Sequence, residues 1–309
     1  MKIAIVQHRP VYFNLTKTVE KAEQLIREAA SQQADIIAFG ETFFTGYPAW
    51  LDHCPKAALW NHAPTKQVFQ NMYENGLDAK GTAMVKLQAL AASLQIYLLF
   101  GANEVLPNGP ANGTIFNSLF IIDPKGDIVL HHRKLMPTFT EKLLYGLGDG
   151  HGLQTISTAE GRIGALICWE HWMPLTRQAL HQEGEQLHFA LWPSVHEAHQ
   201  LASRHYAFEG RCYVVAVGQI MQANDIPKEL ELPTHLEQHP DTYLMNGGSC
   251  VIGPNGNFIL PPQLEMEAIF YQEFPNLQTL IQEKLNLDTS GHYNRPDVFH
   301  FDINKKRLI

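Results

Sequence analysis

Short apolar runs alternate along this chain with longer segments in which apolar and polar residues are mixed. Continuous apolar runs of this length are typical of strands that are covered on both faces. We expect strands at residues 2–7, 35–39, 96–101, 114–123, 127–131, 162–168, 188–192, 212–219 and 248–253. The mixed segments predict helices at residues 17–33, 81–95, 175–182 and 200–210. Because strands and helices alternate from the first element onward, we predict an α/β fold in which helices cover mixed sheets.

The domain organisation follows from the evenness of this pattern. No change in composition marks a linker, so we predict one domain over residues 1–309. Residues 221–246 are polar and contain three prolines, which is typical of a surface insertion. We also expect a short C-terminal tail from about residue 291.

Composition and charge restrict the class of protein. Apolar residues make up 45% of the chain and charged residues 17%, which is the balance of a globular protein. The net charge of −8 argues against nucleic acid or an anionic membrane as a partner. No apolar window is long enough to span a membrane, and the apolar start of the chain is too short for a signal peptide. The four cysteines lack CxxC spacing, so we expect a reduced, cytoplasmic protein without a disulfide framework.

Three polar residues at three predicted strand ends are candidates for chemistry. Cys168 ends an apolar strand and is followed by Trp-Glu-His-Trp, a sequence better suited to a pocket wall than to a core. A nucleophilic thiol needs a base and a cation nearby, and Glu41 and Lys134 end two other strands. Taken singly, each has an ordinary alternative: Cys168 as a small core residue, Glu41 and Lys134 as solvated strand-end charges. Because sites are commonly assembled where strands end at one sheet edge, the combination favours an active site.

The sequences around these residues resemble the signature blocks of the nitrilase superfamily of carbon-nitrogen hydrolases. The three blocks are FGETFFTGYP (39–48), HRKLMPTFTEKLLYGLGDG (132–150) and ALICWEHWMPL (165–175), in the order that the family uses. Further similarity comes from ASRHYAFEGRCYVVAVGQ (202–219), NGGSCVIGPNGN (246–257) and GHYNRPDVF (291–299). Cys-Trp-Glu and the GHYxRPD ending are similar to the true nitrilases rather than to the amidase branches.

The resemblance implies a four-layer αββα sandwich and a Glu-Lys-Cys triad formed by Glu41, Lys134 and Cys168. We expect Cys168 to attack a nitrile carbon, Glu41 to take the thiol proton, and Lys134 with the Trp169 N–H to stabilise the developing negative charge. The family pattern also places a second glutamate, Glu141, beside the lysine. Its alternative role is that of an acid at a helix start.

The substrate expected from this resemblance is a small organic nitrile, hydrolysed with water to a carboxylic acid and ammonia. Residues near the signature blocks are candidates to contact it, although each could equally pack in the core; they are Tyr47, Trp50, Trp169, His171, Trp172 and Pro193. Their aromatic content favours an apolar substituent. The alternatives are an amidase, a cyanide hydratase or dihydratase of the same superfamily, or a non-catalytic binding protein on the same fold.

We expect neither a metal nor another cofactor. The 16 histidines include His196 and His199 in the sequence HEAH, but the zinc-protease motif needs histidines four residues apart. The resemblance also implies a homodimer or larger homo-oligomer that pairs through helices such as 173–182 and 200–210. Because the chain ends soon after Phe299, we do not expect long filaments.

Overall fold

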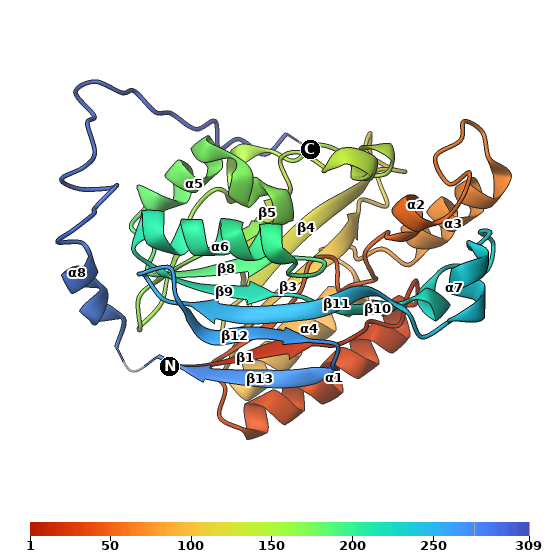
Figure 1. The fold of residues 1–309 in the computed structure, drawn as a ribbon, viewed down its shortest axis with the longest axis horizontal. Coiled ribbons are helices and arrows are strands. Elements are labelled where there is room, and N and C mark those ends of the chain that lie inside the picture. Colours follow the sequence, from red (N-terminus) through yellow and green to blue (C-terminus); the bar gives the residue numbers. More distant parts are fainter. Residues whose placement is uncertain (275, 309) are drawn as a thin grey trace.

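Two mixed β-sheets pack face to face between two outer layers of helices (Figure 1), which is the four-layer arrangement expected from the sequence. The structure is a computed structural model, and it describes residues 1–274 and 276–308. The first sheet has the strand order β13 (Ala268–Glu273), β1 (Lys2–Gln7), β2 (Ile36–Phe39), β3 (Tyr97–Val105), β4 (Ile115–Ile122) and β5 (Ile128–Arg133). The second has the order β10 (Ile220–Gln222), β11 (Tyr243–Ile252), β9 (Tyr213–Val217), β8 (Leu187–Leu191), β7 (Arg162–Ile167) and β6 (Ile156–Ser157), and β12 (Phe258–Leu264) pairs with β11.

Helices cover the outer face of each sheet. The first sheet packs against α1 (Leu15–Ser31) and α4 (Thr82–Leu94), and the second against α5 (Pro174–His181) and α6 (Glu197–Gly210). The remaining helices are short or peripheral: α2 (Trp50–His53), α3 (Ala63–Glu74), α7 (Thr234–Gln238), α8 (Leu280–Glu283), and the 3₁₀ helices η1 (Phe139–Leu143), η2 (Gly150–Gly152), η3 (Cys168–Trp172), η4 (Ala223–Asp225) and η5 (Leu277–Thr279). Among the described residues, no helix combines the length and the apolar character needed to cross a membrane.

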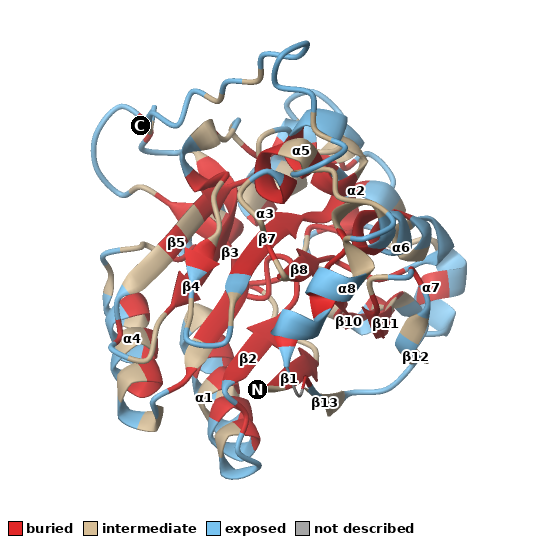
Figure 2. Cartoon of the chain, turned by 90° about the vertical axis from the view of Figure 1, so that its left-hand side faces the viewer, coloured by how far each residue is buried: buried red, intermediate tan, exposed pale blue. Residues whose placement is uncertain are grey.

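The continuous apolar strands have two buried faces, as Figure 2 shows for the central strands. In β1, Ile3 and Ile5 belong to the core between the sheets, whereas Ala4 and Val6 pack with α1 and α4. Successive side chains of a strand point to opposite faces, so a strand covered on both sides must be apolar throughout. The predicted fold class is therefore confirmed, and its physical cause is this double burial.

Element boundaries differ from the sequence prediction mainly at the edges. Helix α1 begins at Leu15, because the Asn14 side chain accepts a hydrogen bond from the Lys17 N–H and caps the helix there. Strand β11 begins at Tyr243, inside the segment 221–246 that we predicted to be an insertion. That segment also carries η4 and α7, and it buries Ile226, Leu230 and Leu236. Its status as an insertion stays a prediction.

The C-terminal tail runs over the molecule without regular secondary structure in residues 299–308 (Figure 1). It is tied to the loop before η2, since Arg307 and the backbone N–H of Leu308 both donate to the carboxylate of Asp149.

Candidate active site

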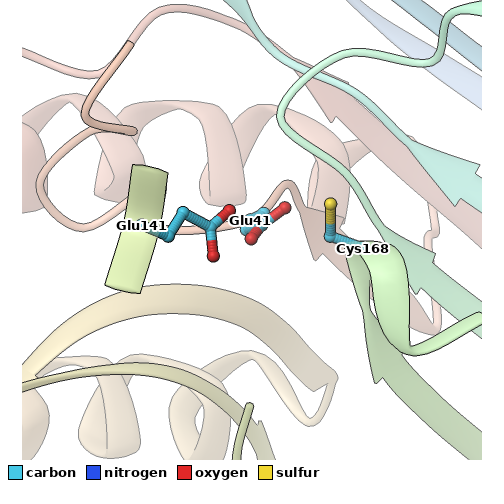
Figure 3. A group of neighbouring side chains, drawn as sticks. All are labelled: Glu41, Glu141 and Cys168. Atoms are coloured by element: carbon cyan, nitrogen blue, oxygen red, sulfur yellow. The ribbon is translucent and has the colours of Figure 1, made fainter. Parts of the chain in front are cut away.

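The carboxyl ends of strands from both sheets bring the three candidate residues together. Strand β2 is parallel to β3, and two antiparallel pairings place β5 parallel to β3, so both β2 and β5 end at the same edge of the first sheet. Glu41 follows β2 and Lys134 follows β5. Cys168 follows β7 of the facing sheet. Figure 3 shows the carboxylates of Glu41 and Glu141 and the sulfur of Cys168 converging on one space.

Lys134 is the central cation of this cluster. Its Nζ lies 2.9 Å from Glu41 Oε1, and 3.0 Å and 2.7 Å from the two oxygens of Glu141. All three side chains are buried. Two further donors orient the carboxylates: Asn117 Nδ2 donates to Glu41 Oε1 at 2.7 Å, and the Tyr47 hydroxyl donates to Glu141 Oε1 at 2.8 Å. Buried charges need such partners, because an unpaired one would cost several kcal/mol.

Cys168 has the geometry of a nucleophile on a tight turn. It is the first residue of η3, its backbone is left-handed with φ 49°, and it is 4% exposed. One ligand-type atom each of Cys168, Glu41 and Glu141 lies within 4.8 Å of the others. Non-glycine residues rarely adopt this conformation, which costs on the order of 1 kcal/mol or more unless the surroundings hold it.

Glu170 fixes this turn against the lysine segment. Its carboxylate accepts hydrogen bonds from the Ile167 N–H at 2.9 Å and the Leu135 N–H at 2.8 Å, and it contacts His132 Nε2 at 2.9 Å. One buried side chain thus joins the backbone beside Cys168 to the backbone beside Lys134. Glu170 belongs to the Cys-Trp-Glu signature, but this role was not predicted from the sequence.

The protonation states follow from burial and charge. Burial raises the pKa of Glu41. The Lys134 ammonium lowers it and the Glu141 carboxylate raises it further, so that the pKa of Glu41 is about 7. Burial and the neighbouring Glu41 also raise the pKa of Cys168 well above its ordinary value. For Lys134, burial alone would lower the pKa, but the negative charges of its neighbours raise it well above the usual range. At rest the site therefore holds a protonated thiol beside a cationic lysine.

One oxygen of Glu41 is left to receive the thiol proton. Among the described residues, Glu41 Oε2 is buried and has no partner at hydrogen-bond distance, whereas Oε1 accepts from both Lys134 and Asn117. A buried, unpaired carboxylate oxygen next to a thiol is suited to accept its proton.

The grouping of Glu41, Glu141 and Cys168 also has the spacing of a metal site. The Lys134 ammonium, however, donates to both carboxylates and supplies the positive charge between them. The chemistry of this set is that of a lysine-centred ion cluster.

A pocket of about 250 Å³ opens in front of Cys168. Of the residues predicted to contact substrate, Tyr47, Trp169 and Pro193 line it. Other lining residues are mostly polar and were not predicted; they are Asp52, His53, Thr138, Ser194, His196 and His199, with Ala49, Leu244 and Met245. The lining is thus more polar than the aromatic candidates alone indicated, and the apolar substituent stays a prediction.

The structure does not bring Trp50, His171 or Trp172 into this lining. Trp50 is fully buried with α3 and the end of β3 in a separate core cluster. The His171 side chain is buried and contacts the Cys168 carbonyl oxygen and the His188 ring. Trp172 packs against the core of the second sheet. In a 3₁₀ turn, residues that follow one another point in different directions, so Trp169 reaches the pocket while His171 and Trp172 do not.

Asn117 is a further residue of the site that was not predicted from the sequence. It lies in β4, 76 residues from Glu41, to which it donates. The available signal was a buried amide in the otherwise apolar strand IFNSLFII, since buried polar side chains need a partner.

Comparison with known proteins identifies the family of this chain. The family model described as carbon-nitrogen hydrolase matches residues 2–280, and the chain belongs to that family. It is 34% identical to a nitrilase 2 of an unknown prokaryotic organism, over 98% of this chain and 92% of the relative. It is 32% identical to a bifunctional nitrilase/nitrile hydratase of Lupinus angustifolius, over 96% of this chain and 84% of the relative. The fold is similar to that of a carbon-nitrogen hydrolase from Helicobacter pylori, with a TM-score of 0.71, 18% identity and 96% of each chain covered.

Proposed function

We propose that this protein is a nitrilase that hydrolyses an organic nitrile to the carboxylic acid and ammonia. The observation that carries the proposal is the Lys134 ammonium, which bonds to both Glu41 and Glu141 in the cluster that contains Cys168. That set provides a nucleophile, a base and a fixed positive charge in one buried space. The named nitrilases among the relatives, at 32 to 34% identity over nearly the whole chain, support a nitrile as the substrate.

In the first half of the reaction, Glu41 Oε2 takes the proton of the Cys168 thiol as the sulfur attacks the nitrile carbon. The π electron pair moves to the nitrile nitrogen, which is stabilised by the Lys134 ammonium and the Trp169 N–H. The nitrogen then receives the proton from Glu41, and a covalent thioimidate remains. Because the pKa of Glu41 is raised to about 7, its carboxyl group can exchange this proton near neutral pH.

In the second half, Glu41 removes a proton from a water molecule that adds to the thioimidate carbon. Glu41 passes this proton to the nitrogen and then transfers the remaining hydroxyl proton to it as well, so that the carbon–nitrogen bond breaks, ammonia leaves with both protons of the water, and a thioester remains. A second water then releases the carboxylic acid and restores the thiol. Glu141, fixed by Tyr47 and by the Thr138 N–H at 2.9 Å, keeps Lys134 in position throughout.

Substitution of the three central residues tests this mechanism. Cys168→Ala, Glu41→Gln and Lys134→Met should each reduce the rate of ammonia release from a nitrile by at least about 1,000-fold, because the three groups act as one unit. Cys250→Ala is the matched control, since Cys250 is equally buried but lies in β11 away from the site. Full activity of Glu41→Gln would refute the role of Glu41 as the base.

The assembly is a second part of the proposal. Helices α5 and α6 present Leu175, Leu201 and Phe208, which are exposed in the single chain. Large apolar side chains gathered on adjacent helices are typical of a protein interface. We therefore expect a homodimer or larger homo-oligomer that pairs through these helices, and we keep the prediction of a cytoplasmic location.

A further inference from the structure

A chain of buried hydrogen bonds runs from the backbone of the nucleophile into the interior of the second sheet. His171 Nδ1 lies 2.6 Å from the Cys168 carbonyl oxygen, and His171 Nε2 lies 2.9 Å from His188 Nε2. His188 Nδ1 in turn lies 2.9 Å from Glu185 Oε2. These three side chains are at most 2% exposed, and the mechanism above does not use them.

Further contacts hold the side chains of this hydrogen-bond chain in place. Glu185 Oε1 accepts from the Tyr206 hydroxyl and contacts His181 Nδ1, and His181 Nε2 faces Glu209. The His171 ring stacks on Trp192, with 4.8 Å between ring centroids, and the His188 ring stacks on Tyr206 at 3.9 Å.

A glycine in the adjacent strand makes room for the carboxylate. At Gly164 in β7, a Cβ atom would lie 2.1 Å from Glu185 Oε2. A larger residue at Gly164 would therefore displace the Glu185 carboxylate and break its hydrogen bond to His188.

The number of protons in this chain can be counted. One end is the Cys168 carbonyl oxygen, which has no proton to donate. The other end is Glu185. Burial raises the pKa of Glu185, but His188 and His181 lower it, and the result is about 2. Three hydrogen bonds between these acceptors and four ring nitrogens require three protons. Two neutral imidazoles carry only two. All three hydrogen bonds are therefore satisfied when the two rings and Glu185 together hold one proton more than two neutral imidazoles and a carboxylate. Burial lowers the pKa of both rings, whereas the Cys168 carbonyl acts to raise that of His171 and Glu185 acts to raise that of both.

The peptide between Cys168 and Trp169 connects this chain of hydrogen bonds to the proposed reaction. In a trans peptide the C=O and the N–H point in opposite directions. Since the carbonyl is directed at His171, the Trp169 N–H is directed away from His171. Cys168 and Trp169 both line the pocket, so we place this N–H on the pocket side. A hydrogen bond to the carbonyl polarises the peptide, so its N–H becomes a stronger donor.

We infer that His171, His188 and Glu185 form a positioning and polarising relay that holds the Trp169 N–H ready for the negative charge of the transition state. This inference rests on the proposed function for the identity of the substrate, and it assigns to His171 a role in the rate of the reaction. His171 acts through the peptide and does not contact the substrate.

Three variants separate the parts of the relay. His171→Phe keeps the ring but removes both hydrogen bonds. His171→Asn retains a donor for the Cys168 carbonyl and loses the bond to His188. Glu185→Gln replaces the carboxylate that accepts from His188 with a neutral amide that can donate to His188 Nδ1, so it keeps a hydrogen bond and removes the charge. His239→Phe, at an exposed position just after α7, is the matched control.

We expect kcat for ammonia release to fall at least about tenfold in His171→Phe while KM changes less than about threefold, because the lost interaction acts only on developing charge. In His171→Asn the decrease in log kcat should be less than half of that in His171→Phe. The kcat of Glu185→Gln should lie between those of the wild type and His171→Phe. Alkylation of Cys168 by iodoacetamide, which builds no such charge, should proceed at the same rate in all of them. Wild-type kcat in His171→Phe, or equal defects in His171→Phe and His171→Asn, would overturn the relay.

A second measurement needs no substrate. In histidine-selective ¹⁵N-labelled protein, the Nδ1 atoms of both His171 and His188 should carry protons, and one ring should carry a proton on both nitrogens. Glu185→Gln should remove one proton from the pair. Two singly protonated rings in the wild type would refute the relay even if nitrile hydrolysis is observed. Conversely, a correct proton count without nitrile hydrolysis would refute the proposed nitrilase activity alone.

Discussion

Glu41 imposes an energetic cost on the folded protein that depends on pH. Its pKa is raised from its ordinary value of 4.5 to about 7, so the folded protein binds its proton more tightly than the unfolded chain does. This favours folding below pH 4.5, and the advantage is lost as the pH rises through 7. The loss is on the order of 3 kcal/mol for a shift of this size.

Glu41→Gln removes this titration. The difference in the free energy of unfolding between variant and wild type should therefore move in favour of the variant as the pH rises from 5 to 8. Urea unfolding at several pH values measures it, with Glu20→Gln on the exposed side of α1 as the control. A difference independent of pH would mean that Glu41 has an ordinary pKa.

At the scale of residues, the sequence could predict groups that follow apolar strands but not the partners that they meet. Glu41, Lys134 and Cys168 each interrupt such a strand end, so their position was visible. The contacts of Asn117 with Glu41 and of Glu170 with Leu135 join residues 76 and 35 positions apart. They depend on strand order, which a single sequence does not reveal.

Strand β3 supports the segment that carries Glu41 by close backbone contact. At Gly101, a Cβ atom would lie 2.4 Å from the Thr42 nitrogen, 2.7 Å from the Gly40 oxygen and 2.8 Å from the Glu41 Cα. These are backbone atoms, which cannot rotate away as the end of a side chain can. The absence of a side chain at Gly101 thus allows β3 to lie close to Glu41, the proposed base.

Gly101→Ala should therefore displace Glu41, reduce kcat at least about tenfold and destabilise the protein by about 1 to 3 kcal/mol. Steady-state kinetics and thermal unfolding measure both effects. Gly253→Ala is the control, because its Cβ would meet only side-chain atoms, at 3.2 Å or more. A fully active Gly101→Ala variant would contradict the close fit.

At the scale of elements, prediction succeeded where burial was continuous. The strands of both sheet centres were found because both of their faces are covered. Strands β12 and β13 and helix α3 were missed. Strand β13 has only half-buried and exposed residues, and α3 buries only Val68 and Met72, so their apolar pattern is weak.

For the whole molecule, the exposed apolar residues of α5 and α6 predict the state of assembly. Leu175→Glu combined with Leu201→Glu should convert the proposed dimer to a monomer, because buried unpaired charges are costly at an interface. Ile281→Glu, on the short helix α8, should leave the assembly unchanged. Sedimentation velocity over a range of concentrations measures it. A wild-type protein that stays monomeric throughout would refute the proposed interface.

The two sheets pack face to face, and only the family resemblance predicted this arrangement of the whole molecule. It places Cys168 of one sheet opposite Glu41 and Lys134 of the other, and it determines which side chains line the pocket. Periodicity identifies which faces are buried, but it does not say against what. For this reason the polar residues Asp52, His53 and His196 were not predicted to line the site.

The most direct test of the proposed activity is the release of ammonia from a panel of aliphatic, aromatic and arylacetonitriles beside the matching amides, with Cys168→Ala as the control and with acid and amide products quantified. We predict release from nitriles with formation of the acid, abolished in the variant, and a preference for nitriles with a hydrogen-bonding substituent that matches the polar pocket. Release mainly from amides, or release from nitriles that persists in Cys168→Ala, would contradict the proposed nitrilase.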